Sequence, residues 1–456
     1  MRLHWLWISA SDLETELEQL ADEGALVPPA LEQRLRRLAA RGDDYLADPR
    51  VQEEAGELLD RTAALGVRDD YPYQEPSDLE GIHALRGPAP PLPEPDRDQA
   101  RLGDRLHGAW LGRAYGCYLG KPVEGLRRQP GETFILEGLL QASGQWPLQG
   151  YYTLDLPPDT LVAHGVDARK AQSWGAGPEY MPEDDDTNYT AVGLAVMARH
   201  GSGFTPREVA AFWLDNIPVG HVCTAERVAY RNFCLNLAPP ESAYYRNPYR
   251  EWIGAQIRAD FFGYAAPGRP ERAAEYAWRD ACISHIKNGI YGEMWAAAML
   301  AAAYVTEDVE MVIRAGLAQI PEHSRLHAAV GEVLAWRAAG KSYQEAIVAL
   351  HARWDEHNAH HWCHTISNAQ ICAVALLWGE GDYATAISRA VLPGLDTDCN
   401  GATVGSIVGM MLGAARLPAK LVGRLQDRIR TGVQGYLDCS ISAMAEQMAQ
   451  VVQSLE

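Results

Sequence analysis

Residues 295–304 read WAAAMLAAAY, a run of small side chains inside a longer helical pattern over residues 269–305. Small side chains let two helices approach closely, so the run indicates tight helix–helix packing. The same pattern, rich in alanine, leucine and methionine, recurs over residues 206–215, 324–339, 342–354, 366–378, 400–415 and 418–454. Alternating β-branched runs, which would predict strands, are almost absent. The sequence therefore predicts an all-α fold, a compact multi-helix bundle.

The first hundred residues divide into a helical part and a proline-rich part. Over residues 11–65, apolar side chains such as Leu13, Leu17 and Leu20 recur at helical spacing. Residues 86–95 read RGPAPPLPEP, which excludes helix and central strand and favours a stiff, extended segment. We predict an N-terminal helical extension over residues 1–85, whose role the sequence does not reveal, a linker over 86–100 and a main domain over 101–456.

The composition excludes several classes of partner. The 456 residues carry a formal net charge of −20, which disfavours binding to nucleic acid or to an anionic membrane surface. The eight cysteines form no CxxC pair, as expected for reduced thiols. We read no signal peptide at the N-terminus and no run long enough to cross a bilayer. We expect a soluble cytoplasmic protein with no nucleic-acid or membrane partner, and its oligomeric state stays open.

Two acidic clusters far apart in the chain carry the strongest chemical signal. They read Asp184-Asp185-Asp186-Thr187 and Asp396-Thr397-Asp398, and an apolar helical pattern follows each. Five converging carboxylates would repel one another unless cations neutralised them, and dense oxygen ligands suit Mg²⁺, Mn²⁺ or Ca²⁺. Either cluster alone is equally explained by an acidic N-cap on a solvated helix. Together they favour a metal site.

An ordered set of motifs accompanies these clusters. Residues 108–124 read GAWLGRAYGCYLGKPVE and residues 395–402 read LDTDCNGA, with Asp185-Asp186-Thr187, Ser284-His285, Asn368-Ala369 and EGDY at 380–383 between them. The set resembles the ADP-ribosylglycohydrolase family, of the metal-dependent type that includes dinitrogenase-reductase-activating glycohydrolase. The resemblance covers roughly residues 101–450, so residues 101–456 are interpreted as the catalytic domain and residues 1–100 lie outside it.

The resemblance implies an all-helical hydrolase with two divalent cations, Mg²⁺ first and Mn²⁺ second. Carried over residue by residue, the metal ligands would be Asp184, Asp185, Asp186, Asp396 and Asp398. The catalytic set would be Glu124, Asp185 and Asp398, with Glu124 as the general acid/base. An alternative for Glu124 is a solvated glutamate at a helix end.

Two residues depart from the family pattern. Asp184 stands where the family has a hydroxyl residue, and its carboxylate is an equally plausible oxygen ligand. Cys399 stands in place of a threonine ligand, and a thiol is a poor partner for a hard cation. The second site would then be weaker, completed by water or selective for a softer ion. Cys399 is equally well explained as a packing residue.

Four residues are assigned to substrate binding: His285, Trp252, Gly254 and Asn400. By resemblance His285 would face the substrate, although a buried histidine with one backbone hydrogen bond explains it as well. The family cradles a diphosphate with a glycine-rich loop, whereas residues 251–258 read EWIGAQIR and keep only Gly254. A nucleobase or small aglycone could stack on Trp252 instead. The histidines at 351, 357, 360, 361 and 364 match no standard zinc spacing.

The sequence thus predicts a metal-dependent hydrolase that cleaves an N- or O-glycosidic bond at the anomeric carbon of ribose. The substrate would be an ADP-ribosyl or smaller ribosyl compound. One alternative is a catalytically weakened sensor that binds a nucleotide or ADP-ribose. Another is a structural scaffold that uses residues 1–100 as a partner-binding arm. Metal binding separates the scaffold from the other two.

Overall fold

The computed structural model describes residues 4–96, 98–167, 174 and 177–455. It is 62 % helical, and its strands β1 (Arg428–Arg430) and β2 (Asp438–Ser440) form one short antiparallel pair, which confirms the all-α prediction. Within the described residues no helix combines the length and apolarity needed to cross a membrane.

The α-helices of the N-terminal part are α1 (Ala10–Asp22), α2 (Pro29–Ala39), α3 (Asp43–Leu46), α4 (Pro49–Thr62) and α5 (Leu79–Ala84). Those of the first half of the main body are α6 (Gln99–Gly120), α7 (Glu137–Ala142), α8 (Pro158–Ala163), α10 (Asp185–His200), α11 (Pro206–Asn216), α12 (Thr224–Cys234), α13 (Glu241–Tyr244), α14 (Asp260–Tyr264) and α15 (Pro270–Ala281). The remainder are α16 (Lys287–Ala303), α17 (Val309–Leu317), α18 (Arg325–Ala338), α19 (Tyr343–Arg353), α20 (Ala359–Cys363), α21 (Thr365–Trp378), α22 (Tyr383–Val391), α23 (Thr397–Leu412), α24 (Ala419–Val422) and α25 (Ile441–Ser454).

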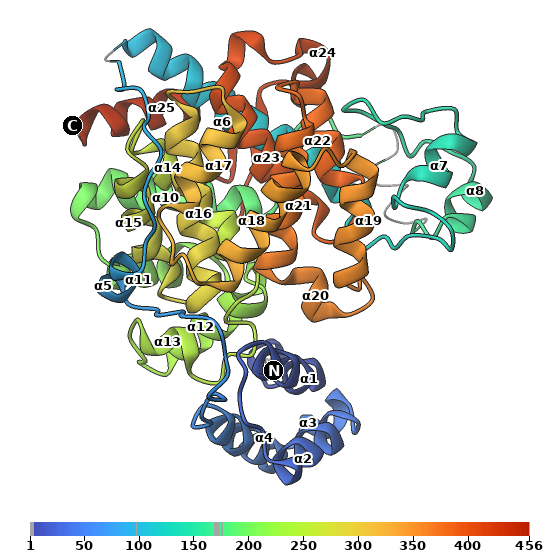
Figure 1. The fold of residues 1–456 in the computed structure, drawn as a ribbon, viewed down its shortest axis with the longest axis vertical. Coiled ribbons are helices and arrows are strands. Elements are labelled where there is room, and N and C mark those ends of the chain that lie inside the picture. The colour runs from blue at the N-terminus through green and yellow to red at the C-terminus, as the bar shows by residue number, and fades with distance from the viewer. Residues whose placement is uncertain (1–3, 97, 168–173, 175–176, 456) are drawn as a thin grey trace.

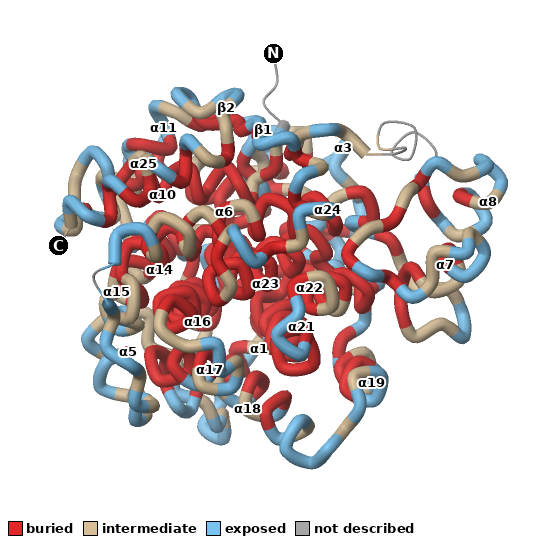
Figure 2. Tube along the Cα trace, turned by 90° about the horizontal axis from the view of Figure 1, so that it is seen from above, coloured by how far each residue is buried: buried red, intermediate tan, exposed pale blue. Residues whose placement is uncertain are grey.

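Helices α6, α16 and α23 lie in the buried centre of the main body, while α7 and α8 project at one side (Figures 1 and 2). The alanine-rich stretch of residues 295–304 belongs to α16 and its C-cap, and it is buried throughout. A Cβ on Gly263 of α14 would lie 2.7 Å from the carbonyl oxygen of Ala297. The small side chains therefore allow the close helix approach that the sequence predicts.

Helices α6 and α23 make the closest backbone contact. Along α6 a glycine stands at every fourth position, so these glycines share one face of the helix, and α23 repeats the spacing; they are Gly108, Gly112, Gly116 and Gly120 against Gly401, Gly405 and Gly409. A Cβ on Gly108 would lie 2.5 Å from the carbonyl oxygen of Gly409, and a Cβ on Gly112 or Gly116 would overlap the opposite backbone. We call this contact the glycine seam.

The seam sets the position of two helix ends. The helices run antiparallel, so the C-terminus of α6 meets the N-terminus of α23. There the hydroxyl of Thr397 donates a hydrogen bond to the carbonyl oxygen of Gly120 (2.9 Å). Consequently the residues after Gly120 and the acidic Asp396-Thr397-Asp398 segment are held side by side.

The N-terminal extension has a small core of its own. Apolar side chains between Ile8 and Leu59 form one cluster, whereas the main core begins with Ile82, and Leu79 and Leu92 pack against it. The chain therefore joins the main body before the proline-rich segment ends. The division into residues 1–85, 86–100 and 101–456 stays an interpretation, and residue 97 lies outside the described residues.

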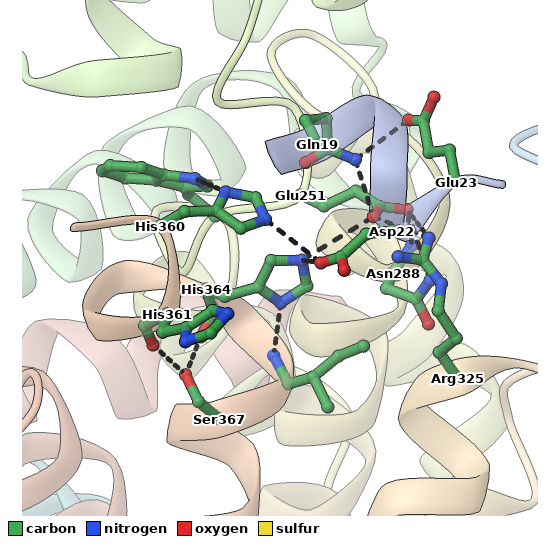
Figure 3. Close-up of polar contacts among 12 residues, drawn as sticks. Gln19, Asp22, Glu23, Glu251, Asn288, Arg325, His360, His361, His364 and Ser367 are labelled. Carbon is green, nitrogen blue, oxygen red and sulfur yellow. Dashed lines mark hydrogen bonds and ion pairs between the residues drawn. The ribbon is translucent and has the colours of Figure 1, made fainter. Parts of the chain in front are cut away.

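Buried ion pairs fasten the extension to the main body. From α1, Asp12 accepts from Arg227 (2.7 Å), and Glu16 and Glu23 accept from Arg250 (2.6 and 2.9 Å). The amide of Gln19 donates to Glu251 (2.9 Å), as Figure 3 shows. Separating such pairs would leave charges without partners in a nonpolar setting, so the extension is an integral part of the fold.

We predict that Gly112→Ala destabilises the protein by about 3 kcal/mol, because the added methyl group would force the two seam helices apart. Gly103→Ala is the matched control on the same helix, because a Cβ there meets nothing within 4 Å. It should be neutral or stabilise by up to about 1 kcal/mol, the helix preference for alanine. Urea denaturation measures both. Equal stability of Gly112→Ala and the natural chain would contradict the seam.

Candidate functional site

The first acidic cluster is the N-terminus of α10. Asp184 is the N-cap residue, and its Oδ1 accepts the backbone N–H of Asp186 (3.0 Å). Asp185 is half-buried in the first turn, and Asp186 is fully buried. Acidic side chains are favoured there by the unpaired N–H groups of the helix start.

The second cluster is the N-terminus of α23. Leu395 has a positive φ of 57°, which turns the chain into the helix. The side-chain oxygen of Asn368 accepts from the backbone N–H of Asp396 (3.2 Å) and from the amide of Asn400 (2.8 Å). Asn400 is completely buried, and its own oxygen accepts from the thiol of Cys372 (3.4 Å). Asn400 thus holds the loop in place, and its assignment to substrate binding stays a prediction.

The structure brings the two clusters together. Ligand atoms of Asp186, Asp398 and Cys399 lie within 4.8 Å of one another, as do those of Cys117, Asp184 and Asp186. Oδ2 of Asp186 and Oδ1 of Asp398 are buried, and neither accepts a hydrogen bond from any described residue. A buried carboxylate oxygen without a donor is costly, so this donor set fits a divalent cation.

The electrostatics support the same interpretation. Burial, and then the charges of Asp184 and Asp398, raises the pKa of Asp185 to about 8. Burial, and then Glu124 and Asp184, raises the pKa of Asp398 to about 8. The pKa values of Asp186 and Asp396 are raised as well, with burial again the first cause. The carboxylates repel one another strongly, and a bound cation would relieve that repulsion.

Two protein cations already lie among the carboxylates. Arg113 is fully buried in α6, with Nη2 3.2 Å from Oδ1 of Asp186 and Nη1 2.7 Å from Asp260. The ammonium group of Lys121 pairs with Oδ2 of Asp184. Burial opposes the charged form of Asp184, but the charge of Lys121 and the hydrogen bonds from Lys121 and Asp186 together outweigh it and lower the pKa of that carboxyl.

Glu124 lies at the exposed edge of this group. It caps the short 3-10 helix η2 (Lys121–Val123), which follows α6 directly. Its charge raises the pKa values of Asp396 and Asp398, so its carboxylate is near both. An exposed carboxylate beside a buried acidic group can exchange protons with solvent and with a reacting molecule.

A family model described as ADP-ribosylglycohydrolase matches residues 98–455. The chain belongs to the ADP-ribosylglycohydrolase family. Members of this family are generally hydrolytic and dependent on divalent metals, and they act on ADP-ribosylated substrates. Among solved structures, one titled "ADP-ribosylglycohydrolase-related protein complex" is similar over 78% of this chain and 99% of its own, with 17% identity and a TM-score of 0.45. A search of the curated proteins found no match.

The loop of residues 251–258 is packed inside the protein. Trp252 is only 5 % exposed, and a Cβ on Gly254 would overlap the carboxylate of Glu226. The backbone N–H of Ile253 donates to Cys363 (2.9 Å) and that of Arg258 to Ala255 (2.9 Å). These N–H groups are therefore already used within the protein. Substrate contact by Trp252 and Gly254 stays a prediction.

His285 is also internal. Its side chain is completely buried, and its Nδ1 is 2.8 Å from the hydroxyl of Ser284. It lies near Glu226, at 4.0 Å, and not in either acidic group. Its Nε2 is buried without a hydrogen-bond partner among the described residues, so the buried-histidine alternative and a role facing the substrate both stay predictions.

A third group of possible metal ligands lies where the extension meets the main body (Figure 3). Nδ1 of His360 accepts the indole N–H of Trp252 (2.9 Å), and Nδ1 of His364 accepts the backbone N–H of Ile366 (3.1 Å). A neutral imidazole whose Nδ1 accepts carries its proton on Nε2. Both Nε2 atoms face Asp22, at 3.1 and 3.8 Å. His360 donates to Asp22, whereas Nε2 of His364 is too far from Asp22 for a hydrogen bond and has no partner among the described residues. With a proton on each Nε2, neither atom offers a lone pair to a metal, so we interpret this group as a polar contact and not as a zinc site.

Sequence reasoning missed Arg113 and Lys121. Each is a single cation within the glycine-rich segment of residues 108–124, where neighbouring side chains are small or apolar. A charge at such a position must be paired when buried. That signal was present, although the partner carboxylates lie far away in the sequence.

We predict that stability falls as the pH drops, partly through His285. Burial, and then the charge of Arg258, lowers the pKa of its imidazole well below 6.5. Below pH 6.5 the unfolded chain takes up a proton that the native state does not bind, so the free energy of unfolding decreases. The contribution is roughly 1.4 kcal/mol for each pH unit. The measurement is urea denaturation at about pH 7.5 and about pH 5.5, within the range where histidine titrates.

His285→Gln should lose less stability than the natural chain over that interval. Exposed His323 provides the control, because His323→Gln should keep the natural dependence. An unchanged pH dependence in His285→Gln would contradict the assignment.

Proposed function

We propose that this protein is a divalent-metal-dependent hydrolase that cleaves an N- or O-glycosidic bond at the anomeric carbon of ribose. The main support is a pair of buried oxygens that accept no hydrogen bond from any described residue, Oδ2 of Asp186 and Oδ1 of Asp398. Two motifs far apart in the chain bring Asp186 and Asp398 into one group of possible ligands, and the chain's family is generally hydrolytic.

The cation would be held by Asp186 and Asp398, with Asp185 and Asp396 beside them. When bound, a divalent cation supplies a Lewis acid that holds the ribose hydroxyls and lowers the pKa of a water molecule. Oxygen donors at this density favour Mg²⁺, or Mn²⁺ as the second choice. Arg113 fixes the carboxylate of Asp186, and Asn368 fixes the backbone of Asp396.

Glu124 is the residue that transfers a proton in the proposed reaction. Water adds its oxygen to C1 of ribose while the C1–N or C1–O bond breaks, through an oxocarbenium-like transition state. Glu124 accepts the proton of the attacking water, and a proton passes to the leaving group. Its exposed position beside Asp396 and Asp398 supports this role.

The packing of residues 251–258 bears on the size of the substrate. In a diphosphate-binding loop, free backbone N–H groups contact the phosphates. Here the N–H groups of Trp252, Ile253, Ile257 and Arg258 donate to backbone carbonyls, whereas those of Gly254, Ala255 and Gln256 form no such bond among the described residues. The carboxylate of Glu226 lies over Gly254, and Trp252 is buried. This packing supports a ribosyl substrate smaller than ADP-ribose, although an ADP-ribosyl group bound in another way belongs to the same proposal.

The eight cysteines are free thiols, which supports a reducing, cytoplasmic location as part of the proposal.

The first experiment measures turnover with and without Mg²⁺ or Mn²⁺. The panel contains ADP-ribosylated arginine and serine peptides, ADP-ribose 1″-derivatives and simple nucleosides. Metal-dependent release of ribose from nucleosides alone would establish the smaller substrate, and release of ADP-ribose would establish the larger. Metal binding without turnover of any compound would favour a nucleotide sensor.

We predict that Asp398→Asn lowers Mn²⁺ affinity by at least about 100-fold and abolishes turnover, because it removes a charged oxygen ligand. Isothermal titration calorimetry measures the affinity. Asp215→Asn is the matched control, since Asp215 is exposed on α11 and should bind Mn²⁺ normally. Unchanged affinity in Asp398→Asn would remove this residue from the metal site.

We predict that Glu124→Gln keeps Mn²⁺ affinity and lowers kcat by ~10²–10⁴-fold, the usual contribution of general acid/base catalysis. The amide preserves the shape of the side chain but cannot accept the proton. Calorimetry and steady-state kinetics on the same preparation separate the two effects. Normal turnover would exclude Glu124 from proton transfer.

A further inference from the structure

The two groups of ligand atoms at the acidic site share one residue, Asp186, but differ in what already occupies them. In the group of Cys117, Asp184 and Asp186, both oxygens of Asp184 are used. Its Oδ1 accepts the backbone N–H of Asp186, and its Oδ2 pairs with the ammonium group of Lys121. A cation at this position would have to displace the lysine.

The group of Asp186, Asp398 and Cys399 is different. Asp186 and Asp398 of this group each carry one buried oxygen to which no described residue donates a hydrogen bond. The other oxygen of Asp186 faces Arg113 at 3.2 Å. Asp186 therefore points one oxygen at a protein cation and offers the other to a ligand.

The fold holds the backbone of Lys121 in place, and its side chain reaches Asp184 from the edge of the site. It follows the last residue of α6, whose carbonyl accepts the Thr397 hydroxyl, and its side chain is 26 % exposed. Burial opposes the charge of its ammonium group, and the charges of Asp184 and Asp398 favour it. Asp184, which stands in place of a hydroxyl residue, and Lys121 together form a pair with no net charge.

We propose that the ammonium group of Lys121 replaces one of the two metal ions that the family resemblance implies, so that this chain binds a single divalent cation at Asp186 and Asp398. The inference rests on the metal-dependent function proposed above. Asp184 is then a positioning residue for Lys121 and not a metal ligand.

The test is a titration of the full chain with Mn²⁺, followed by calorimetry and electron paramagnetic resonance. The natural chain should bind one ion per chain and show the spectrum of an isolated Mn²⁺. Lys121→Met and Lys121→Gln should bind two ions, with the spectrum of a spin-coupled pair, because Asp184 becomes free. Lys420→Met, which removes an exposed lysine of α24, should stay at one.

Two ions in the natural chain would overturn this inference and leave the proposed function standing. A single ion in folded Lys121→Met and Lys121→Gln would also overturn it, since the position would then not depend on the lysine. No ion in the natural chain would overturn both proposals. The stoichiometry of the natural chain decides the question even where the variants fail to fold.

Discussion

Direct backbone contact between α6 and α23 is the constraint on which the site depends. At Gly108, Gly112 and Gly116 the helices are too close for a side chain, so their relative position is fixed by main-chain atoms. Because the helices are rigid and antiparallel, fixing their contact also fixes the positions of their ends. At these ends the turn after Gly120 meets the acidic start of α23, and the acidic start of α10 lies beside them. The glycines thus position the acidic residues through backbone contact alone.

The site also shows how a protein tolerates many carboxylates in a dry interior. Arg113 holds Asp186 from inside the bundle, while Lys121 holds Asp184 from its edge. The remaining oxygens of Asp186 and Asp398 stay without a donor among the described residues. Retaining a fully charged ligand set without a counter-ion would be unfavourable, so the fold compensates part of the charge and leaves part for a cation.

Much of the fold was predictable from local patterns. Alanine-rich helical repeats, the acidic helix starts and the order of the motifs each depend on short stretches, and the all-α fold and the meeting of Asp186 with Asp398 agree with them. What could not be predicted depends on long-range pairing. Whether Lys121 faces Asp184 or water is decided by the seam, which no short stretch encodes.

The substrate assignments show the same limit. Trp252 looks like a stacking surface in the sequence, yet its indole N–H is used by His360, more than a hundred residues away. Gly254 looks like a remnant of a phosphate loop, yet the carboxylate of Glu226 lies over it. Residue types that serve ligands also serve packing, and only the spatial neighbours separate the two uses.

The ion pairs between the extension and the main body bear on where the folding unit ends. The family match begins at residue 98, but the carboxylates that neutralise buried Arg227, Arg250 and Arg325 include Asp12, Glu16 and Glu75, all before that point. A shortened chain starting at the match would leave Arg227 and Arg250 without these carboxylates, whereas Arg325 would keep its pair with Glu251. The family match therefore covers only part of the unit that the buried ion pairs hold together.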